Sequence, residues 1–243
     1  MARRTYPDSD DDNGRSCRLF PCLPAIACLH SDSVCDRDSI VQMRQQALQA
    51  ATQGQHQRAI AVFNRLLACH PDSAEDYSNR GLIQLWSGQH HRALADFNRA
   101  LALNPDLAPA YNNRASYFAA HGAYQRAIAD YDSAIDLNPL NIRARINRAV
   151  TLRDLKCYDE ALSALDEALL FHQMQGHIYA ERGRTYHLQG DWNRAIADYR
   201  RALLFFSTPD VTTVFDTAKR DRVRQWLQAL LPNAPIEPPA NAE

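Results

Sequence analysis

Three asparagines, Asn79, Asn113 and Asn147, stand 34 residues apart in the sequence. A side-chain amide offers one acceptor and two donors, the groups that pair with the C=O and N–H of an extended peptide backbone. If a regular repeat brings the three amides to one face, they would form a ladder that binds a peptide. The sequence leaves a second interpretation open, in which asparagine is simply common at this place and hydrogen-bonds within its own layer.

Catalytic chemistry has little support in the sequence. The motifs Gly-x-x-x-x-Gly-Lys, Gly-x-Ser-x-Gly and His-Glu-x-x-His are absent, and the nine histidines are scattered. His177 and His187 are ten residues apart, whereas two ligands on one helix face would be four apart. We therefore expect no enzyme, with no catalytic, cofactor-binding or metal-binding residue.

The six cysteines form no Cys-x-x-Cys pair. Cys69 and Cys157 fall in helical stretches, and the N-terminal cysteines, together with His30, match no common zinc or iron–sulfur spacing. We interpret all six as free thiols in a reducing compartment, which favours a cytoplasmic location. The N-terminal cysteines are Cys17, Cys22, Cys28 and Cys35.

The charge balance argues against polyanionic partners. The 243 residues include 27 basic and 28 acidic side chains, so the formal net charge is -1. Such a chain has no bulk attraction to phosphate, and we expect neither nucleic-acid binding nor binding to a membrane through basic residues. The longest apolar stretch, residues 19–29, contains two prolines and is too short for a membrane-spanning helix. We therefore expect no membrane insertion.

The sequence repeats itself with a period of 34 residues. Five units begin at Ile40, Ala74, Ala108, Ile142 and Gly176, and a place is counted from each of these starts. Place 8 is always small, place 20 is always alanine, and place 24 is always large. Small residues allow two helices to approach closely, and the large residue fills the space between units. The three sets are Ala47, Gly81, Ala115, Ala149, Gly183; Ala59, Ala93, Ala127, Ala161, Ala195; and Phe63, Phe97, Tyr131, Leu165, Tyr199.

Glycine at place 15 and proline at place 32 divide each unit into two helices. The expected first helices are 40–53, 74–87, 108–121, 142–155 and 176–189, and the expected second helices are 56–69, 90–103, 124–137, 158–171 and 192–205. An apolar pattern over 210–231 predicts a further amphipathic helix that covers the last repeat. Residues 1–38 and 232–243 are expected to be disordered tails.

This pattern resembles the tetratricopeptide repeat over residues 40–207. The resemblance implies an all-α, right-handed superhelical solenoid of five repeats (40–73, 74–107, 108–141, 142–175 and 176–209), followed by a C-terminal capping helix. The pentatricopeptide repeat, which reads RNA, has a period of 35 and would not supply the alanine and proline places in this register.

The resemblance also implies which residues bind a partner. In this family the first helices line a concave face, and ligands touch mainly places 2, 5, 6, 9, 12 and 13. Place 6 holds the three asparagines of the ladder, and similar ladders occur in superhelical repeat proteins that bind peptides. The candidate peptide-binding residues are Asn79, Asn113, Asn147, Asn112, Trp86, Arg44, Arg143 and Arg184.

One subclass of the family binds the C-terminal carboxylates of chaperones through a clamp of lysine, arginine and asparagine. At the corresponding places this chain has Arg44, Leu48, Asn79, Pro109 and Asn113, of which only Asn79 matches well. We therefore expect chaperone tails to be unlikely partners.

Two features of the repeats allow more than one interpretation. Arginine at place 7 accompanies aspartate at place 23 in three repeats, which predicts ion pairs Arg80–Asp96, Arg114–Asp130 and Arg182–Asp198. The fourth repeat has Arg148 but Ala164, so Arg148 would borrow Asp130, point to solvent or contact a ligand. Trp86 is either an exposed anchor point for a partner or ordinary core packed on the first repeat.

We expect a non-catalytic adaptor, scaffold or assembly factor that binds an extended peptide of a partner protein in its concave groove. The alternative is a structural subunit of a larger complex that uses its convex face or its capping helix, and a nucleic-acid-binding helical repeat ranks third. Ala25, Ile26 and Ala27 before Cys28 resemble a cleavage site, so secretion or a lipid anchor is another alternative for the N-terminal stretch. Alternatively, the natural protein begins later, for instance at Met43.

Overall fold

The computed structural model describes residues 37–207 and 214–231, and the predictions for residues 1–36, 208–213 and 232–243 lie outside these ranges. Within them the chain forms eleven α-helices and no strand. The helices are α1 (Arg37–Thr52), α2 (His56–Cys69), α3 (Ala74–Trp86), α4 (His90–Leu103), α5 (Ala108–Ala120), α6 (Tyr124–Leu137), α7 (Ile142–Asp154), α8 (Tyr158–Leu169), α9 (Gln175–Gln189), α10 (Trp192–Phe206) and α11 (Val214–Leu230).

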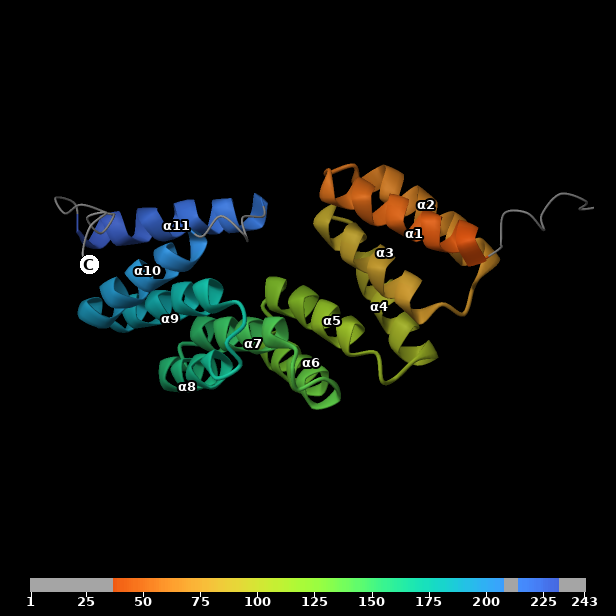
Figure 1. Cartoon of the computed structure of the whole chain (residues 1–243). Coiled ribbons are helices and arrows are strands. Elements are labelled where there is room, and N and C mark those ends of the chain that lie inside the picture. Colours follow the sequence, from red (N-terminus) through yellow and green to blue (C-terminus); the bar gives the residue numbers. More distant parts are fainter. Residues whose placement is uncertain (1–36, 208–213, 232–243) are drawn as a thin grey trace, which may run out of the picture.

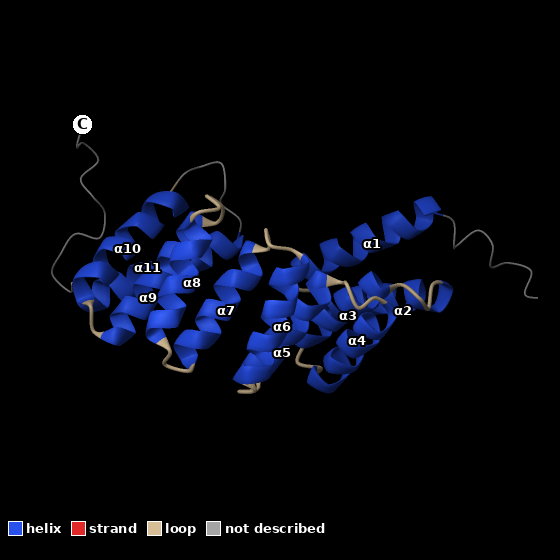
Figure 2. Cartoon of the chain, turned by 90° about the horizontal axis from the view of Figure 1, so that it is seen from below, coloured by secondary structure: helices blue, strands red, loops and turns tan. Residues whose placement is uncertain are grey.

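The helices form the right-handed solenoid that the resemblance to the tetratricopeptide repeat implies. In Figure 1 the chain curves as an arc, with α1 at one end, α11 at the other, and α5 to α7 between them. Figure 2 shows the arc from below, with successive helix pairs side by side along its length. Each first helix packs against the second helix of its own repeat and against that of the preceding repeat.

Small residues bring the two helices of a repeat together. In the second repeat a β-carbon added to Gly81 would lie only 2.7 Å from Cε1 of the Phe97 ring, so glycine is needed for this close approach. In the third repeat, where Ala115 takes the same place, Tyr131 fills the corresponding space, and both are almost fully buried. The repeating alanines and the large residue at place 24 therefore form a continuous core along the solenoid.

Arginine at place 7 links three helices. Arg80 donates from Nε and Nη2 to the two carboxylate oxygens of Asp96, both at 2.7 Å, and from Nη1 to Asn64 of the preceding repeat at 2.8 Å. Each guanidinium therefore joins its own first helix to its own second helix and to the second helix before it. The predicted pairs are present, and the same pattern recurs as Arg114 with Asp130 and Asn98, and as Arg182 with Asp198 and Asp166.

Arg148 in the fourth repeat does not take Asp130, which is held by Arg114. Its Nε donates to Asp132 of the preceding repeat at 2.6 Å. This is the position at which Asn64 and Asn98 meet the arginines of the second and third repeats. At place 23 it is Asp198, and not Asp130, that two arginines share, namely Arg182 and Arg201.

One cysteine prediction is wrong. Cys69 is disulfide-bonded, whereas Cys157 is a free thiol. Sequence spacing gave no sign of this bond, because disulfide pairing depends on which residues meet in the tertiary structure. A disulfide bond at Cys69 does not support a reducing compartment, and the cytoplasmic location stays a prediction.

Lys156 occupies a backbone conformation that favours glycine. Its φ is 65°, and Gly54, Gly88, Gly122 and Gly190 at the same place in the other repeats have φ between 73° and 92°. A β-carbon in this left-handed region costs about 1–2 kcal/mol, and part of the gain from removing it is lost because glycine is more flexible in the unfolded chain.

We therefore expect Lys156→Gly to stabilise the protein by about 0.5–1 kcal/mol. Thermal unfolding followed by circular dichroism should show a melting temperature about 2 °C higher. Lys156→Ala is the control, because it removes the charge and keeps the β-carbon. An equal gain in Lys156→Ala would contradict backbone strain as the cause.

Candidate functional site

The asparagine row lies on consecutive first helices of the solenoid. Asn79 is on α3, Asn113 is on α5 and Asn147 is on α7, and each side chain is partly exposed. Asn113 donates from Nδ2 to the hydroxyl of Ser78 in the preceding repeat at 3.2 Å. Asn113 is thus partly used in a bond between two repeats, not within its own layer as the second interpretation expects, and its amide oxygen is still an acceptor for a ligand.

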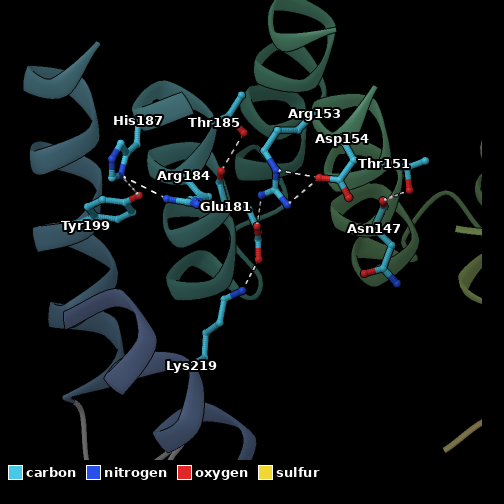
Figure 3. A network of polar contacts seen from close by, with 10 residues as sticks. All are labelled: Asn147, Thr151, Arg153, Asp154, Glu181, Arg184, Thr185, His187, Tyr199 and Lys219. Atoms are coloured by element: carbon cyan, nitrogen blue, oxygen red, sulfur yellow. Dashed lines mark hydrogen bonds and ion pairs between the residues drawn. The ribbon is translucent and has the colours of Figure 1, made fainter. Parts of the chain in front are cut away.

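The Asn147 amide is placed differently. Its backbone oxygen accepts a hydrogen bond from Thr151 at 2.9 Å, and its side-chain amide points away from this contact in Figure 3. Asn79 and Asn147 therefore present amide groups of the kind that an extended backbone can pair with.

Asn112 adds a buried acceptor to this row. Its side-chain oxygen Oδ1 is shielded from solvent and has no hydrogen-bond partner in the structure. A buried polar atom without a partner costs about 1–3 kcal/mol, so a ligand N–H that reaches Oδ1 would recover this energy. The amides of Asn79, Asn112 and Asn147 thus offer hydrogen-bonding groups on three neighbouring helices.

Trp86 is not ordinary core. Its side chain is 51% exposed at the end of α3, and its indole ring lies 6.3 Å from the His56 ring of the first repeat. Leu82 and Leu85 on the same helix are only partly buried. Trp86 therefore offers an apolar surface beside the amide row, as the anchor interpretation predicts.

Arg44 is engaged within the protein. Its Nε and Nη2 donate to the two carboxylate oxygens of Asp76 at 2.7 and 2.8 Å, and Nη2 also contacts the Ser73 hydroxyl at 3.2 Å. The Asp76 side chain is fully buried, so Arg44 is its charge partner. The hydrogen bond to Asp76 raises the pKa of Arg44 despite its partial burial. Arg44 borders a hollow of about 710 Å³, but it primarily docks α1 onto α3.

The capping helix α11 packs against α10 and α9, the two helices of the fifth repeat. Glu181 on α9 is buried and accepts hydrogen bonds from Nη1 of Arg153 on α7 at 2.5 Å and from the ammonium of Lys219 on α11 (Figure 3). Burial alone would raise the pKa of Glu181, but the charges of Lys219 and Arg153 outweigh it, and the pKa is lowered. Glu181 is therefore a carboxylate that joins three helices.

Arg184 also belongs to the contact with α11. Its guanidinium lies over the Trp226 ring at 5.1 Å, and the Trp226 ring is 5.8 Å from that of Tyr199. Burial raises the pKa of Tyr199 to about 12, so the phenol stays neutral and contacts Nδ1 of His187 at 3.2 Å. Arg184, predicted as a peptide-binding residue, therefore packs against the capping helix.

The eight predicted residues fall into two groups. Asn79, Asn112, Asn113, Asn147, Trp86 and the exposed Arg143 occupy the first helices α3, α5 and α7. Arg44 and Arg184 have partners at the two ends of the solenoid. The predicted residues away from these two ends therefore lie in the second to the fourth repeat, and we call the surface that they form the amide groove.

The ion pairs of two side chains, Asp76 and Lys219, were not predicted from the sequence. Asp76 is an acid at place 3, where the third, fourth and fifth repeats have Ala110, Ala144 and Ile178, and that contrast is the signal that could have revealed it. Lys219 is one of only two lysines in the chain, and the change from asparagine to Glu181 at place 6 could have pointed to a cationic partner.

Other kinds of site find no support in the described part of the chain. Residues 37–207 and 214–231 bring no three His, Cys, Asp or Glu side chains together in a way that could hold a metal ion. Among the helices of these ranges, none combines the length and the apolar character needed to cross a bilayer.

Comparison with known proteins agrees with the repeat architecture. Family models described as tetratricopeptide repeat match residues 46–115, 112–176 and 146–210. A comparison with curated proteins found no matching relative.

Solved structures with a similar fold are more numerous. A thermophilic TPR protein from Thermus thermophilus is 20% identical, with 79% of this chain and 98% of that chain covered at a TM-score of 0.65. A tetratricopeptide repeat protein from Parabacteroides merdae is 21% identical, with 81% and 76% covered at 0.63. PilF of Pseudomonas aeruginosa is 18% identical, with 81% and 94% covered at 0.61. At these identities the likeness shows the fold.

Proposed function

The chain belongs to the tetratricopeptide repeat family, whose repeats generally mediate contacts between proteins, and we propose that its amide groove binds an extended peptide of a partner protein. The protein would act as a non-catalytic adaptor, scaffold or assembly factor. The observation that carries this proposal is the row of partly exposed amides of Asn79, Asn113 and Asn147 on the consecutive first helices α3, α5 and α7.

The contacts in the groove favour a backbone-directed mode of binding. Amide groups pair with the peptide N–H and C=O, which every residue except proline carries, so they favour an extended chain over a particular sequence. Trp86 adds an exposed aromatic surface of the kind that serves as an anchor in protein interfaces, and Arg143 adds an exposed cation on α7. A partner segment with an apolar residue near Trp86 and an acid near Arg143 fits this order.

Two other classes of partner are disfavoured by the sequence. The near-zero net charge disfavours nucleic acid as a partner. The carboxylate-clamp places are not matched, which disfavours chaperone tails. A cytoplasmic location and the lack of catalysis remain predictions.

The groove can be tested by removing its amides. We expect the variant Asn79→Ala/Asn113→Ala/Asn147→Ala to bind its partner about ten-fold or more weakly, because each lost hydrogen bond contributes about 0.5–1.5 kcal/mol. The partner peptide would come from capture of native proteins on the immobilised chain, followed by mass spectrometry and calorimetry with the synthetic peptide.

The matched control removes three amides from the outer helices, as Gln57→Ala/Gln125→Ala/Asn193→Ala, all at exposed positions. The control should bind like the unaltered protein. The pair Asn79→Ala/Asn147→Ala checks that the loss does not come from the Ser78 contact of Asn113. Unchanged affinity in the triple variant would show that the row serves only the packing of the repeats.

A further inference from the structure

Large apolar side chains are exposed at the ends of the second helices in the third, fourth and fifth repeats. Leu170 is 76% exposed and Leu140 is 63% exposed. They stand at or just after the ends of α6, α8 and α10, which lie along one edge of the solenoid because the repeats stack in register. We call this set the apolar edge: Leu137, Leu140, Leu170, Met174, Leu204 and Phe205.

The fold does not require an apolar residue at place 33. At place 33 the first and second repeats have Asp72 and Asp106, whereas the third and fourth have Leu140 and Met174. All four repeats form the same helix pairs, so an acid satisfies the architecture at this place. Exposed leucine gains nothing in the isolated chain, and a group of such residues along one edge indicates an interaction surface.

The loop after α8 is also held in an uncommon conformation. His172 and Met174 have φ of 54° and 50°, in the left-handed region that residues other than glycine rarely adopt. The loop contains Leu170 and lacks the proline that follows α2, α4 and α6. Backbone strain of this kind concentrates at binding surfaces, where it positions particular side chains.

An acidic surface borders the apolar edge. The outer helix α8 contains four acidic residues and no basic one, namely Asp159, Glu160, Asp166 and Glu167. The neighbouring α6 adds the exposed Asp136. Asp132 of α6 and Asp166 of α8 already pair with Arg148 and Arg182, so the carboxylates left for a partner are Asp136, Asp159, Glu160 and Glu167. A hollow of about 500 Å³ joins the two features, because acidic and apolar side chains line it together: Asp159, Leu162, Ser163, Asp166, Glu167 and Leu170.

The other outer helices have the opposite charge. α2 has Arg58 and Arg65 and no acid, and the single acid of α4, Asp96, is buried against Arg80. In α10 the single acid is Asp198, which is also buried in an ion pair. The negative surface is therefore confined to the third and fourth repeats, next to the apolar edge.

We propose that the apolar edge and the acidic face of α8 form a second binding site, distinct from the amide groove, for a basic amphipathic helix of a partner protein. The leucines would contact the apolar side of that helix, and its lysines or arginines would face the carboxylates of α8 and α6. Helices that pack about 8–10 Å apart give three repeats an edge of about 20 Å, which a helix of about 15 residues covers. An anionic membrane does not fit this surface, because the acidic border would repel its headgroups.

The probe is a fluorescent helical peptide of about 18 residues, long enough to cover the edge, with leucine on one face and lysine on the other. Its control has the lysines replaced by glutamates. We expect fluorescence anisotropy to show that the unaltered protein binds the lysine peptide at least ten-fold more tightly than the glutamate peptide. The affinity should fall as salt is raised, because the charges of the border are exposed.

Two variants divide the site into its parts. Leu140→Ser/Leu170→Ser should weaken lysine-peptide binding about ten-fold or more, and Leu188→Ser, an exposed leucine on α9 away from the edge, should leave it unchanged. Asp159→Asn/Glu167→Gln should weaken binding several-fold and reduce its salt dependence. Asp72→Asn/Asp106→Asn makes the same change of charge in the first two repeats and should have little effect.

Several outcomes would overturn the proposal. Equal affinity for the two peptides, or equal losses in a variant and its control, would show that the surface does not recognise the probe. A dimer of the unaltered protein that dissociates in Leu140→Ser/Leu170→Ser would assign the edge to a second copy. Sedimentation with phosphatidylglycerol vesicles would assign it to lipid. If the variant Asn79→Ala/Asn113→Ala/Asn147→Ala no longer binds the lysine peptide, that peptide occupies the amide groove.

Discussion

Glu181→Gln should loosen the capping helix and lower the free energy of unfolding by about 3–5 kcal/mol. The substitution keeps the shape of the side chain and removes its charge. Lys219 and Arg153, whose side chains are only 18% and 12% exposed, would then face each other without the carboxylate that both contact. Buried cations without a partner are costly, so α11 would lose its polar contact with α9.

The same carboxylate makes this contact sensitive to acid. The folded pKa of Glu181 is lowered from its ordinary value of 4.5, so the ionised form stabilises the folded state. A group with a lowered pKa contributes its stability above the unfolded pKa and loses it as the pH falls through the folded value. The contribution is therefore complete above about pH 5 and decreases as the pH falls below 4.5. In Glu181→Gln this part of the pH dependence should disappear.

Urea denaturation followed by Trp226 fluorescence measures this effect, with Trp86 and Trp192 replaced by phenylalanine. Asp154→Asn is the control, because Asp154 also contacts Arg153, at 3.3 Å, but its side chain is 44% exposed. Its cost should be about 0–1 kcal/mol. Adding Lys219→Gln to Glu181→Gln should recover part of the loss. Similar small costs in Glu181→Gln and Asp154→Asn would contradict the role of Glu181.

Arg44→Ala should also cost about 3–5 kcal/mol, because it leaves the fully buried carboxylate of Asp76 without its cation. The double variant Arg44→Ala/Asp76→Ala should be more stable than Arg44→Ala alone, since no buried charge is left unpaired. The loss should be concentrated at the N-terminal end, where Arg44 joins α1 to α3.

Hydrogen exchange can locate this loss, and urea denaturation can measure it. Faster exchange in α1 and α2, with little change in α9 and α10, is the expected pattern. Arg148→Ala is the matched control, because its partner Asp132 is 48% exposed. This substitution should lower the free energy of unfolding by only about 0–1 kcal/mol. If Arg44→Ala unfolds like Arg148→Ala but binds a partner peptide less well, Arg44 serves the ligand and not the docking of α1.

The sequence by itself determined the architecture, for a physical reason that particular residues show. Gly81 and Phe97, like Ala115 and Tyr131, meet within a single repeat, where the two helices are joined by a short turn and their relative position is narrowly restricted. Every repeat therefore needs a small residue at place 8 and a large one at place 24, and this shared requirement produces the 34-residue period in the sequence. The pairs of Arg80, Arg114 and Arg182 with aspartates 16 residues later were predictable on the same ground.

The register of the repeats also predicted where the amide row lies, but the partners of the candidate arginines became visible only in the folded chain. Asn79, Asn112 and Asn147 lie on the groove helices, as their register predicts. Arg44 and Arg184 have the same kind of register, yet Asp76 engages the first and Trp226 covers the second. Both contacts occur at an end of the array: Asp76 is an acid that the later repeats lack at place 3, and Trp226 belongs to α11, a helix beyond the repeats.

Contacts outside the repeat could not be read from its period. Lys219 reaches Glu181 from a helix that lies beyond the repeats, 38 residues along the chain, and Cys69 is disulfide-bonded without any signal in its spacing. Such contacts depend on the curvature of the solenoid and on the docking of its terminal helices. These are properties of the folded chain, because no single repeat contains both partners.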